Sequence, residues 1–454
     1  MHTQNLPFAD LLNANCACTT LSQDLLAQQL EIDDELKGLA QQLQTSHPHL
    51  FSQTAVFIDQ AQKLAIQNLI QAIETVFAST SYVQLAFKNS PAVSQINNGP
   101  KGVFMGYDFH LSDQGPRLIE INTNAGGAFL NAALAKAHHA CCQAMTVQGI
   151  AFPAQLTSNV FQDFLEMFQA EWRYQHQHLN GQANCPPLQT IVIVDDQPEQ
   201  QFLAPEFELA RLLFEKQGLE AVIADPQDLT FKNGKLFCKC LKSGLPVDLV
   251  YNRLTDFNFE MPQHEALKQA YEAGAAVITP NPYTHAIYAQ KSNLMLLNDS
   301  VLLSQWNIHP SVQAILAKGV PASCLVTAEN ASWLWAERKN YFFKPVAGYG
   351  SKAVYKGEKI TKKVWAEIQT HDYIAQQLVP PSERLVNVNG QLEKLKVDIR
   401  AYVYEGKIQL LAARTYSGQT TNMRTPGGGF SPVIELPELA SIDIQSYIQQ
   451  LEKT

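Results

Sequence analysis

Residues 106–122, with the sequence "GYDFHLSDQGPRLIEIN", restrict the possible folds more than any other stretch of this chain. They contain two runs in which apolar and polar residues alternate, a pattern typical of strands with one buried face. Between the runs, Asp113-Gln114-Gly115 predicts a three-residue hairpin loop with Gly115 in the left-handed region. The register of this hairpin places Asp108 opposite Glu120. We therefore expect an antiparallel hairpin that carries two facing carboxylates.

Polar side chains interrupt the second of these strands. Because the side chains of a strand alternate between two faces, Leu118, Glu120 and Asn122 are expected on one face and Ile119 on the other. With Asp108 across the hairpin, two carboxylates and an amide oxygen would converge. Such carboxylates repel each other unless a hard cation lies among them, and oxygen ligands of this kind suit Mg²⁺ held together with substrate phosphates. The alternative is an edge strand with solvated polar residues, and the spacing alone does not separate the two.

The composition excludes several classes of protein. The chain has 454 residues, enough for about two to four domains. A net charge of -9 argues against a nucleic-acid-binding protein, and no apolar run approaches the length of a membrane span. The first residues, "MHTQNLPFADLL", lack the basic start and apolar core of a signal peptide. We therefore expect a cytoplasmic protein without nucleic-acid or membrane partners. The eight cysteines include no C-x-x-C pair and are expected to be reduced.

The chain changes its pattern along its length. From Leu21 to about Phe87, apolar residues recur every three or four positions, which predicts amphipathic helices. Further on, "LQTIVIVDD", "LEAVIAD", "VDLVYNRL" and "AAVITPNP" read as buried parallel strands, with "EFELARLLFEKQG" and "PQHEALKQAYEAG" as helices between them. This alternation predicts a doubly wound βαβ domain. It has no G-x-G-x-x-G, so we do not expect the usual dinucleotide site.

A glycine-rich loop lies between two further predicted strands, in "KNYFFKPVAGYGSKAVYKG". The first strand delivers Lys344, and the loop contains Gly348, Gly350 and Ser351. Strand, loop and strand make a hairpin lid rather than a strand-to-helix P-loop, and the glycines allow backbone N–H groups to approach phosphate oxygens. The alternative is a simple glycine turn.

Basic residues follow on a pair of predicted strands, "KVDIRAYVYEGKIQLLAARTY". This pair carries Asp398, Arg400 and Arg414, and "TTNMRTPGGGFSPV" then adds Asn422. Two arginines on paired strands, beside a lysine and a glycine lid, predict a site for a polyanion.

The order of these parts resembles the ATP-grasp superfamily. In that superfamily, a lysine and a glycine-rich hairpin cover the nucleotide phosphates, a hinge strand holds the adenine, and a second subdomain presents arginines and magnesium ligands. The segment "G-x-D…E-x-N" comes last in most members, whereas here it lies far upstream. This arrangement is similar to circularly permuted members such as eukaryotic-type glutathione synthetases and glutathionylspermidine-synthetase-like proteins. The resemblance covers about 101–131 and 189–433.

The resemblance implies an α/β (α+β) fold: a permuted ATP-grasp with a doubly wound βαβ substrate-associated domain and an N-terminal helical region. The implied parts are the N-terminal helical region (1–100), the metal-binding hairpin with the following helices (101–185), the doubly wound domain (186–285), the nucleotide-binding subdomain with its glycine lid (286–380) and the second ATP-grasp subdomain (381–454).

The resemblance also implies roles for individual residues. The nucleotide phosphates would be contacted by Lys291 and Lys344, under a lid formed by Gly348, Gly350 and Ser351. The adenine would be lined by Gln376, Gln377, Leu378 and Val379. Magnesium would be held by Asp108, Glu120 and Asn122. The triphosphate or the acylphosphate would be faced by Arg400, Arg414 and Asn422.

This sequence departs from the family pattern at three places. The hinge position often occupied by glutamate is Gln377, and the glutamate that glutathione synthetases place in the glycine lid is Gly348. Neither arginine nor lysine occurs around Met105, where those enzymes use an arginine to hold the peptide substrate. These departures argue against glutathione as the product.

The activity implied by the resemblance is amide formation. ATP and Mg²⁺ would activate a carboxylate as an acylphosphate, which an amine would then attack; the partners would be a small-molecule acid and an amine or a short peptide. Two alternatives stay open: a kinase that stops at phosphoryl transfer, and a nucleotide-binding protein without ligase activity. At the carboxyl ends of strands in the doubly wound domain, Arg253, Asp256 and His285 either contact substrate or cap loops.

Overall fold

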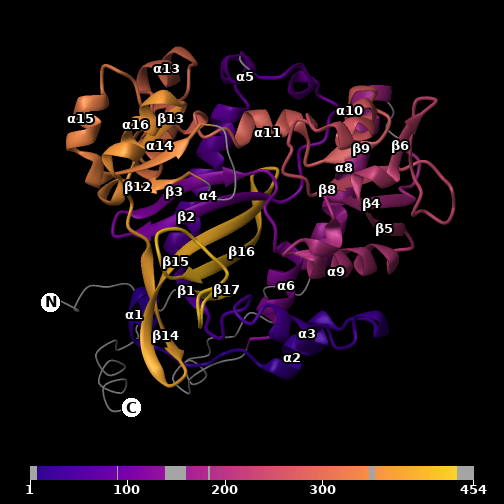
Figure 1. The fold of residues 1–454 in the computed structure, drawn as a ribbon, viewed down its shortest axis with the longest axis horizontal. Coiled ribbons are helices and arrows are strands. Elements are labelled where there is room, and N and C mark those ends of the chain that lie inside the picture. Colours follow the sequence, from indigo (N-terminus) through magenta and orange to yellow (C-terminus); the bar gives the residue numbers. More distant parts are fainter. Residues whose placement is uncertain (1–7, 89, 139–159, 182–184, 347–352, 437–454) are drawn as a thin grey trace.

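A seven-stranded sheet made from three distant parts of the chain forms the centre of the molecule (Figure 1). The computed structural model describes residues 8–88, 90–138, 160–181, 185–346 and 353–436. The strand order is β1-β17-β16-β15-β2-β3, and β14 also pairs with β15. These strands are β1 (Val56–Asp59), β2 (Met105–Ser112), β3 (Gly115–Asn122), β14 (Ser382–Val388), β15 (Gln391–Tyr404), β16 (Lys407–Tyr416) and β17 (Gly429–Leu436).

The long strand β15 joins the upstream hairpin to the C-terminal strands. Its first half pairs with β14, and its second half pairs antiparallel with β2, so that Arg400 lies opposite Asp108. On the other side of β2, Asp108 lies opposite Glu120, as the sequence predicted. The hairpin at 105–122 therefore extends a sheet whose other strands come from residues 391–436 and from β1.

The hairpin differs from its prediction in two details. Gly115 has φ +99° as expected, but it pairs with Ser112, so the loop contains two residues rather than three. A β-bulge interrupts the register after Asp108, and Ile119 is the extra residue. Because a bulge shifts the alternation by one, Leu118 points into the apolar core with Ile121 and not to the side of Glu120.

The N-terminal region contains the predicted amphipathic helices and, between them, one strand that was not predicted. Its helices are α1 (Phe8–Asn15), α2 (Gln23–Leu30), α3 (Leu39–Ser46), α4 (Gln60–Phe77) and α5 (Thr80–Phe87). Between α3 and α4, however, β1 pairs in parallel with β17. Asp59 then ends the strand and caps α4, with Gln62 completing the capping box. The apolar face of α4 packs on the central sheet through Ile66, Ile70 and Ile73.

The doubly wound unit was predicted correctly. Its parallel sheet has the order β5-β4-β8-β9, formed by β4 (Thr190–Val194), β5 (Glu220–Ala224), β8 (Leu249–Asn252) and β9 (Val277–Thr279). Helices α9 (Ala204–Glu215) and α10 (Glu265–Glu272) lie beside it, with the hairpin of β6 (Leu229–Lys232) and β7 (Lys235–Cys238) (Figure 1). Two further helices, α6 (Ala128–Lys136) and α8 (Val160–Asn180), share an apolar core with this unit. Within the described ranges, no helix combines the length and apolar content that crossing a bilayer requires.

A third unit contains the strand that carries Lys344. Its sheet has the order β10-β13-β11-β12, formed by β10 (Ser323–Leu325), β11 (Tyr341–Pro345), β12 (Tyr355–Lys356) and β13 (Tyr373–Gln377). Strands β11 and β12 pair antiparallel, as the predicted hairpin requires, but residues 347–352 of the glycine loop lie outside the described residues. Its helices, and those leading to it, are α11 (Pro282–Tyr288), α12 (Asn293–Leu296), α13 (Ser300–Gln305), α14 (Pro310–Gly319), α15 (Ala331–Ala336) and α16 (Lys362–Thr370).

A buried carboxylate ties the doubly wound unit to the central sheet at the entrance to β2. Glu171 of α8 is fully buried and accepts hydrogen bonds from the backbone N–H groups of Lys101 and Gly102, at 2.8 and 2.9 Å. The hydroxyls of Thr279 and Tyr404 also donate to it, at 2.6 and 2.9 Å. One side chain therefore joins α8, β9, β15 and the segment that leads into the hairpin.

We expect Glu171→Gln to lower the free energy of unfolding by about 1–3 kcal/mol. The amide keeps the size of the side chain, but in either orientation its NH₂ group faces two donors and cannot accept from them. Urea unfolding followed by circular dichroism measures the change. The control is Glu166→Gln on an exposed position of the same helix, for which we expect a change within about 0.5 kcal/mol. Equal stability of the two variants would contradict this role.

Candidate functional site

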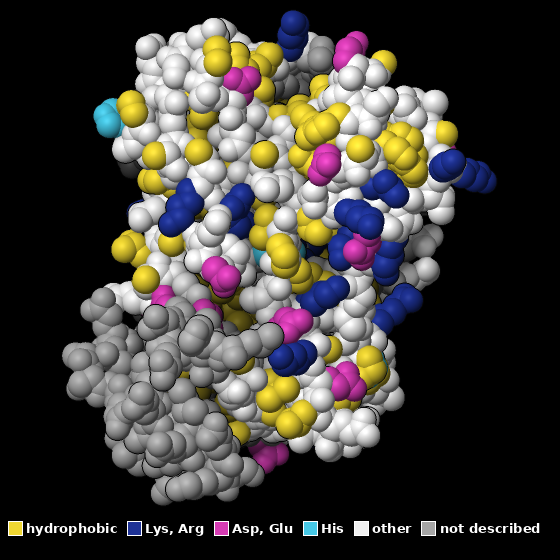
Figure 2. Space-filling model, turned by 90° about the vertical axis from the view of Figure 1, so that its left-hand side faces the viewer, with side chains coloured by type: hydrophobic (Ala, Val, Ile, Leu, Met, Phe, Trp, Pro, Cys, Tyr) yellow, Lys and Arg dark blue, Asp and Glu magenta, His cyan; other side chains and the backbone are white. Residues whose placement is uncertain are grey.

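A cavity of about 560 Å³ lies where the central sheet, the β10–β13 sheet and α11 meet. On the face shown in Figure 2, Lys and Arg side chains gather across the middle of the view. The cationic residues that line the cavity are Lys291, Lys344, Lys356, Lys396 and Arg414. Four carboxylates, those of Asp108, Glu120, Glu383 and Asp398, line the cavity as well, so its cations suit an anionic ligand without giving the cavity a large net charge.

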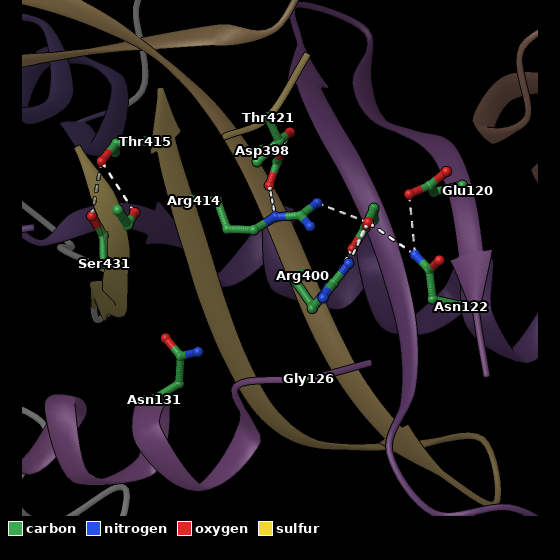
Figure 3. Close-up of polar contacts among 12 residues, drawn as sticks. Glu120, Asn122, Gly126, Asn131, Asp398, Arg400, Arg414, Thr415, Thr421 and Ser431 are labelled. Atoms are coloured by element: carbon green, nitrogen blue, oxygen red, sulfur yellow. Dashed lines mark hydrogen bonds and ion pairs between the residues drawn. The ribbon is translucent and has the colours of Figure 1, made fainter. Parts of the chain in front are cut away.

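A row of paired charges forms the floor of this region (Figure 3). Asp108 is 1% exposed and accepts two hydrogen bonds from Arg400, at 2.7 and 2.8 Å, and one from Arg414 at 2.8 Å. Arg414 also donates from Nε to Asp398 at 2.6 Å, and Asp398 accepts from the Thr421 hydroxyl at 2.5 Å. Burial acts to raise the pKa of Asp108, but the charges of the two arginines outweigh it and hold this pKa at about 2.

The three predicted magnesium ligands lie together. The Asn122 side-chain N–H₂ group donates to Asp108 and to Glu120, at 3.2 Å each (Figure 3). Both oxygens of Asp108 are already engaged by guanidinium groups. By contrast, the Asn122 Oδ1 atom accepts no hydrogen bond from any described residue, and both Glu120 and Asn122 line the cavity. These two side chains offer oxygen ligands of the kind Mg²⁺ prefers. Magnesium binding by all three residues stays a prediction.

The donor set is small for a metal held by protein alone. In the described part of the chain, no group of three or more His, Cys, Asp or Glu side chains is arranged to hold a metal ion. A carboxylate and an amide oxygen fit the other arrangement, in which Mg²⁺ takes one or two protein ligands and completes its shell with phosphates and water.

Lys344 reaches the central sheet from β11. It is 6% exposed, and its Nζ atom donates to the Gln376 side chain at 2.6 Å and to the carbonyl of Ile119 at 3.0 Å. Burial lowers its pKa to about 8. Lys291 lines the same cavity, whereas Gly348, Gly350 and Ser351 lie outside the described residues.

The predicted hinge also borders the cavity, along its whole length from Gln376 to Val379. The backbone N–H groups of Gln377 and Leu378 donate to protein carbonyls, at 2.8 Å each. The carbonyl of Val379 lies 2.8 Å from His110 Nδ1, which links the hinge to β2.

Two of the predicted catalytic residues do not line the cavity. Arg400 lies behind Arg414, paired with Asp108. Asn422 holds the loop before β17 together, because it donates to the carbonyl of Ser417 at 2.9 Å and accepts from Thr425. Their catalytic roles stay predictions.

Several lining residues were missed as site residues. Asp398 could have been found, because it lies two positions before Arg400 on the same strand and so shares its face. His110 could have been found in the same way, because it lies two positions after Asp108 on β2. Thr421 and Phe257 gave no such signal, because they lie in loops.

The strand-end residues of the doubly wound domain were expected either to contact substrate or to cap loops, and the structure places them differently. His285 lines the cavity. Asp256 caps its own loop instead, accepting from the Met261 backbone N–H at 2.8 Å and contacting His264 at 2.7 Å. Arg253 is 7% exposed and donates to Asn124 behind the cavity wall.

We expect Asp108→Asn to destabilise the fold by about 3–5 kcal/mol, because it leaves two buried guanidinium groups without their shared carboxylate. Urea unfolding measures this, and Asp113→Asn in the exposed loop of the same hairpin is the control, with an expected change within about 0.5 kcal/mol. A stable Asp108→Asn variant would show that the arginines do not need this partner.

Comparison with known proteins gives a match at the level of structure. No family model and no curated protein matches the sequence. A glutathione synthetase-like effector from Globodera pallida, solved in its apo form, matches with a TM-score of 0.52 at 13% identity, over 91% of this chain and 97% of that one. A gamma-glutamylcysteine synthetase-like protein from Methylobacillus flagellatus gives a TM-score of 0.45 at 11% identity, over 84% and 89%.

The ATP-grasp ligase PsnB, complexed with a minimal precursor, Mg and ADP, gives a TM-score of 0.27 at 15% identity, over 58% of this chain and 98% of that one. The match to the effector spans nearly the whole length of both proteins. The resemblance to glutathione synthetase-like proteins is therefore confirmed at the level of the fold: this chain has the α/β fold of a glutathione synthetase-like protein.

Proposed function

We propose that this chain is an ATP-dependent carboxylate–amine ligase that requires Mg²⁺ and forms an amide through an acylphosphate. The observation that carries the proposal is the convergence on one cavity of Lys344, Arg414 and the Glu120–Asn122 pair. Cations for phosphate and oxygen ligands for Mg²⁺ are what phosphoryl transfer from ATP requires. The fold shared with a glutathione synthetase-like protein supports the same conclusion.

The nucleotide would lie between the hinge and the central sheet. The base would lie against Gln376, Gln377, Leu378 and Val379, and the phosphates would meet Lys291 and Lys344 under a lid formed by Gly348, Gly350 and Ser351. Because Lys344 spans from β11 to the carbonyl of Ile119, a phosphate bound to it would be held at the edge of β3.

Glu120 and Asn122 would hold Mg²⁺ at this edge, and the ion would supply positive charge to the transferred phosphoryl group. Asp108 would join them only if it released a guanidinium group. In the structure its role is to hold Arg400 and Arg414 in place. Arg414 lines the cavity and would bind the transferred phosphoryl group, with Arg400 and Asn422 proposed to act from behind it.

The proposed reaction has two steps. A carboxylate oxygen of the acid attacks the γ-phosphorus of ATP, and ADP leaves with the electron pair of the broken P–O bond. The amine nitrogen then attacks the acyl carbon of the acylphosphate, and phosphate leaves. Positioning and charge neutralisation suffice for both steps, so no protein nucleophile is required.

A single set of assays separates this ligase from its two alternatives. ATP and Mg²⁺ are supplied with amino acids, small peptides and polyamines in pairs, and phosphate release is measured. Hydroxylamine replaces the amine in a second assay, because it converts an acylphosphate into a stable hydroxamate. A ligase gives release that depends on acid and amine together, and hydroxamate that depends on the acid. A kinase phosphorylates an acceptor without amide formation, and a protein without ligase activity binds ATP but releases no phosphate.

We expect Lys344→Ala to raise the dissociation constant for ATP by about 10- to 100-fold, since a charge-assisted hydrogen bond to a phosphate is lost. Calorimetry measures the constant. Thermal unfolding is followed in parallel, because the substitution also removes a donor from Gln376 and Ile119. Lys363→Ala on the exposed side of α16 is the control. Unchanged ATP affinity would contradict the placement of the phosphates.

We expect Glu120→Gln to lower turnover by about 100-fold or more, because the swap keeps the size of the side chain but removes the negative charge that would hold Mg²⁺. Stability should change by at most about 0.5 kcal/mol. Turnover is measured at saturating Mg²⁺ with the acid and amine found by the screen, beside Glu393→Gln, an exposed position on β15. Wild-type turnover in the Glu120 variant would mean that Glu120 is only a polar strand residue.

A further inference from the structure

His285 lines the cavity, and two neighbouring side chains hold its ring. It stacks on Phe257, with ring centroids 3.7 Å apart and an interplanar angle of 8°. Its Nδ1 atom lies 2.9 Å from the hydroxyl of Thr123. Phe257 follows β8 and Thr123 follows β3, so two sheets fix the orientation of the ring.

The hydrogen bond to Thr123 indicates which nitrogen of His285 carries the proton. Thr123 is 1% exposed, and within the described residues its hydroxyl makes no other hydrogen bond. If the hydroxyl accepted from the ring, its own O–H would be buried without an acceptor, which is unfavourable. The hydroxyl therefore donates to Nδ1. A neutral imidazole whose Nδ1 accepts has its proton on Nε2.

The Nε2–H group faces the cavity. Among the described residues, Nε2 makes no hydrogen bond. A fully buried Nε2 would then be an unsatisfied buried nitrogen, and the unsatisfied buried nitrogens of the described residues do not include it. It is thus accessible in a cavity that His285 lines. Burial, aided by the positive charge of Lys291, lowers the pKa of His285 to about 3, so the ring is neutral near pH 7.

The neighbours of His285 point to the reacting end of a substrate. Thr123 directly follows Asn122, and consecutive Cα atoms are about 3.8 Å apart. His285, Glu120 and Asn122 also line the same cavity, in which the γ-phosphoryl group would lie beside the Glu120–Asn122 pair. A substrate group that enters this cavity to receive the phosphoryl would therefore meet both the Glu120–Asn122 pair and His285.

We propose that the Nε2–H group of His285 donates a hydrogen bond to a carboxylate oxygen of the acid substrate. This inference rests on the proposed ligase function and makes His285 a catalytic residue of it. One carboxylate oxygen attacks the γ-phosphorus, and ADP leaves. The other oxygen, bound to Nε2–H, becomes the carbonyl of the acylphosphate. When the amine adds to the acyl carbon, this oxygen takes the negative charge, until phosphate leaves with the amine proton and the amide forms. His285 keeps its own proton throughout.

A neutral donor suits this position. A fixed N–H group that is aimed where negative charge develops stabilises the transition state without reorganisation. A protonated histidine would instead add a positive charge beside Lys291 and the proposed Mg²⁺. Phe257 and Thr123 act as positioning residues, because they set the plane of the ring and its tautomer.

The first test reads the tautomer directly in the full-length wild-type protein. Nitrogen NMR of the ligand-free protein, assigned by comparison with His285→Gln, should show a protonated Nε2 and an unprotonated Nδ1 from about pH 6 to pH 8. A ring protonated on Nδ1, or a ring that titrates in this range, would overturn the proposal.

The second test uses the hydroxylamine assay with the acid identified by the screen. We expect His285→Ala to lower hydroxamate formation by about 100-fold and to raise KM for the acid, with ATP affinity unchanged. His285→Gln supplies an N–H₂ donor and should recover part of the loss. Thr123→Val keeps the shape of Thr123 but removes its hydroxyl, and should lower the rate by about tenfold.

The outcomes separate this inference from the proposed function. Wild-type hydroxamate rate and acid KM in His285→Ala would overturn the role of His285 and leave the ligase intact. If His285→Ala does not fold, a wild-type rate in Thr123→Val overturns it. Loss of ATP affinity in step with loss of rate would also overturn it. If the wild-type protein itself forms no acid-dependent hydroxamate, the ligase proposal fails and the acid-binding role of His285 fails with it.

Discussion

The ion pairs of Asp108 hold the site and the central sheet together. Arg400 and Arg414 are 292 and 306 residues away from Asp108 in sequence, yet both donate to its carboxylate in a buried environment. A buried charge without a partner is strongly destabilising, so β2 has one favourable register against β15, the one that places Asp108 opposite Arg400. Because Asp108 also lies opposite Glu120, the same pairing sets the position of the Glu120–Asn122 pair at the cavity.

The β-bulge in the hairpin links this sheet to the unit that carries Lys344. Ile119 is the extra residue, and its carbonyl accepts from Lys344. A regular strand would turn Ile119 away from the side of Glu120, but the bulge brings both residues to the cavity while Leu118 stays in the core. The position of the lysine therefore depends on a local irregularity in a strand of a different sheet.

The difference between local and long-range interactions explains which features could be predicted from the sequence. The facing of Asp108 and Glu120 and the strands of the doubly wound unit follow from alternation, apolar runs and turn residues, all of which are local signals. The bulge and the strand β1 do not: β1 has four residues, and its partners in β17 are Val433 to Leu436, so only long-range pairing makes it a strand. Thr123, Phe257 and Thr421 reach the site from loops, and no periodicity marks them.

Charge balance connects the structure of the site with the proposed need for Mg²⁺. The cluster contains three cations, Arg400, Arg414 and Lys344, and three carboxylates, Asp108, Glu120 and Asp398. The formal charges of these six side chains therefore cancel before any nucleotide binds. Within the described residues the Arg414 Nη1 group has no partner, so two carboxylates hold this arginine in place and still leave donors for an anion. A triphosphate bound here would bring excess negative charge next to Glu120, and a divalent cation between Glu120 and the phosphates is the arrangement that neutralises it.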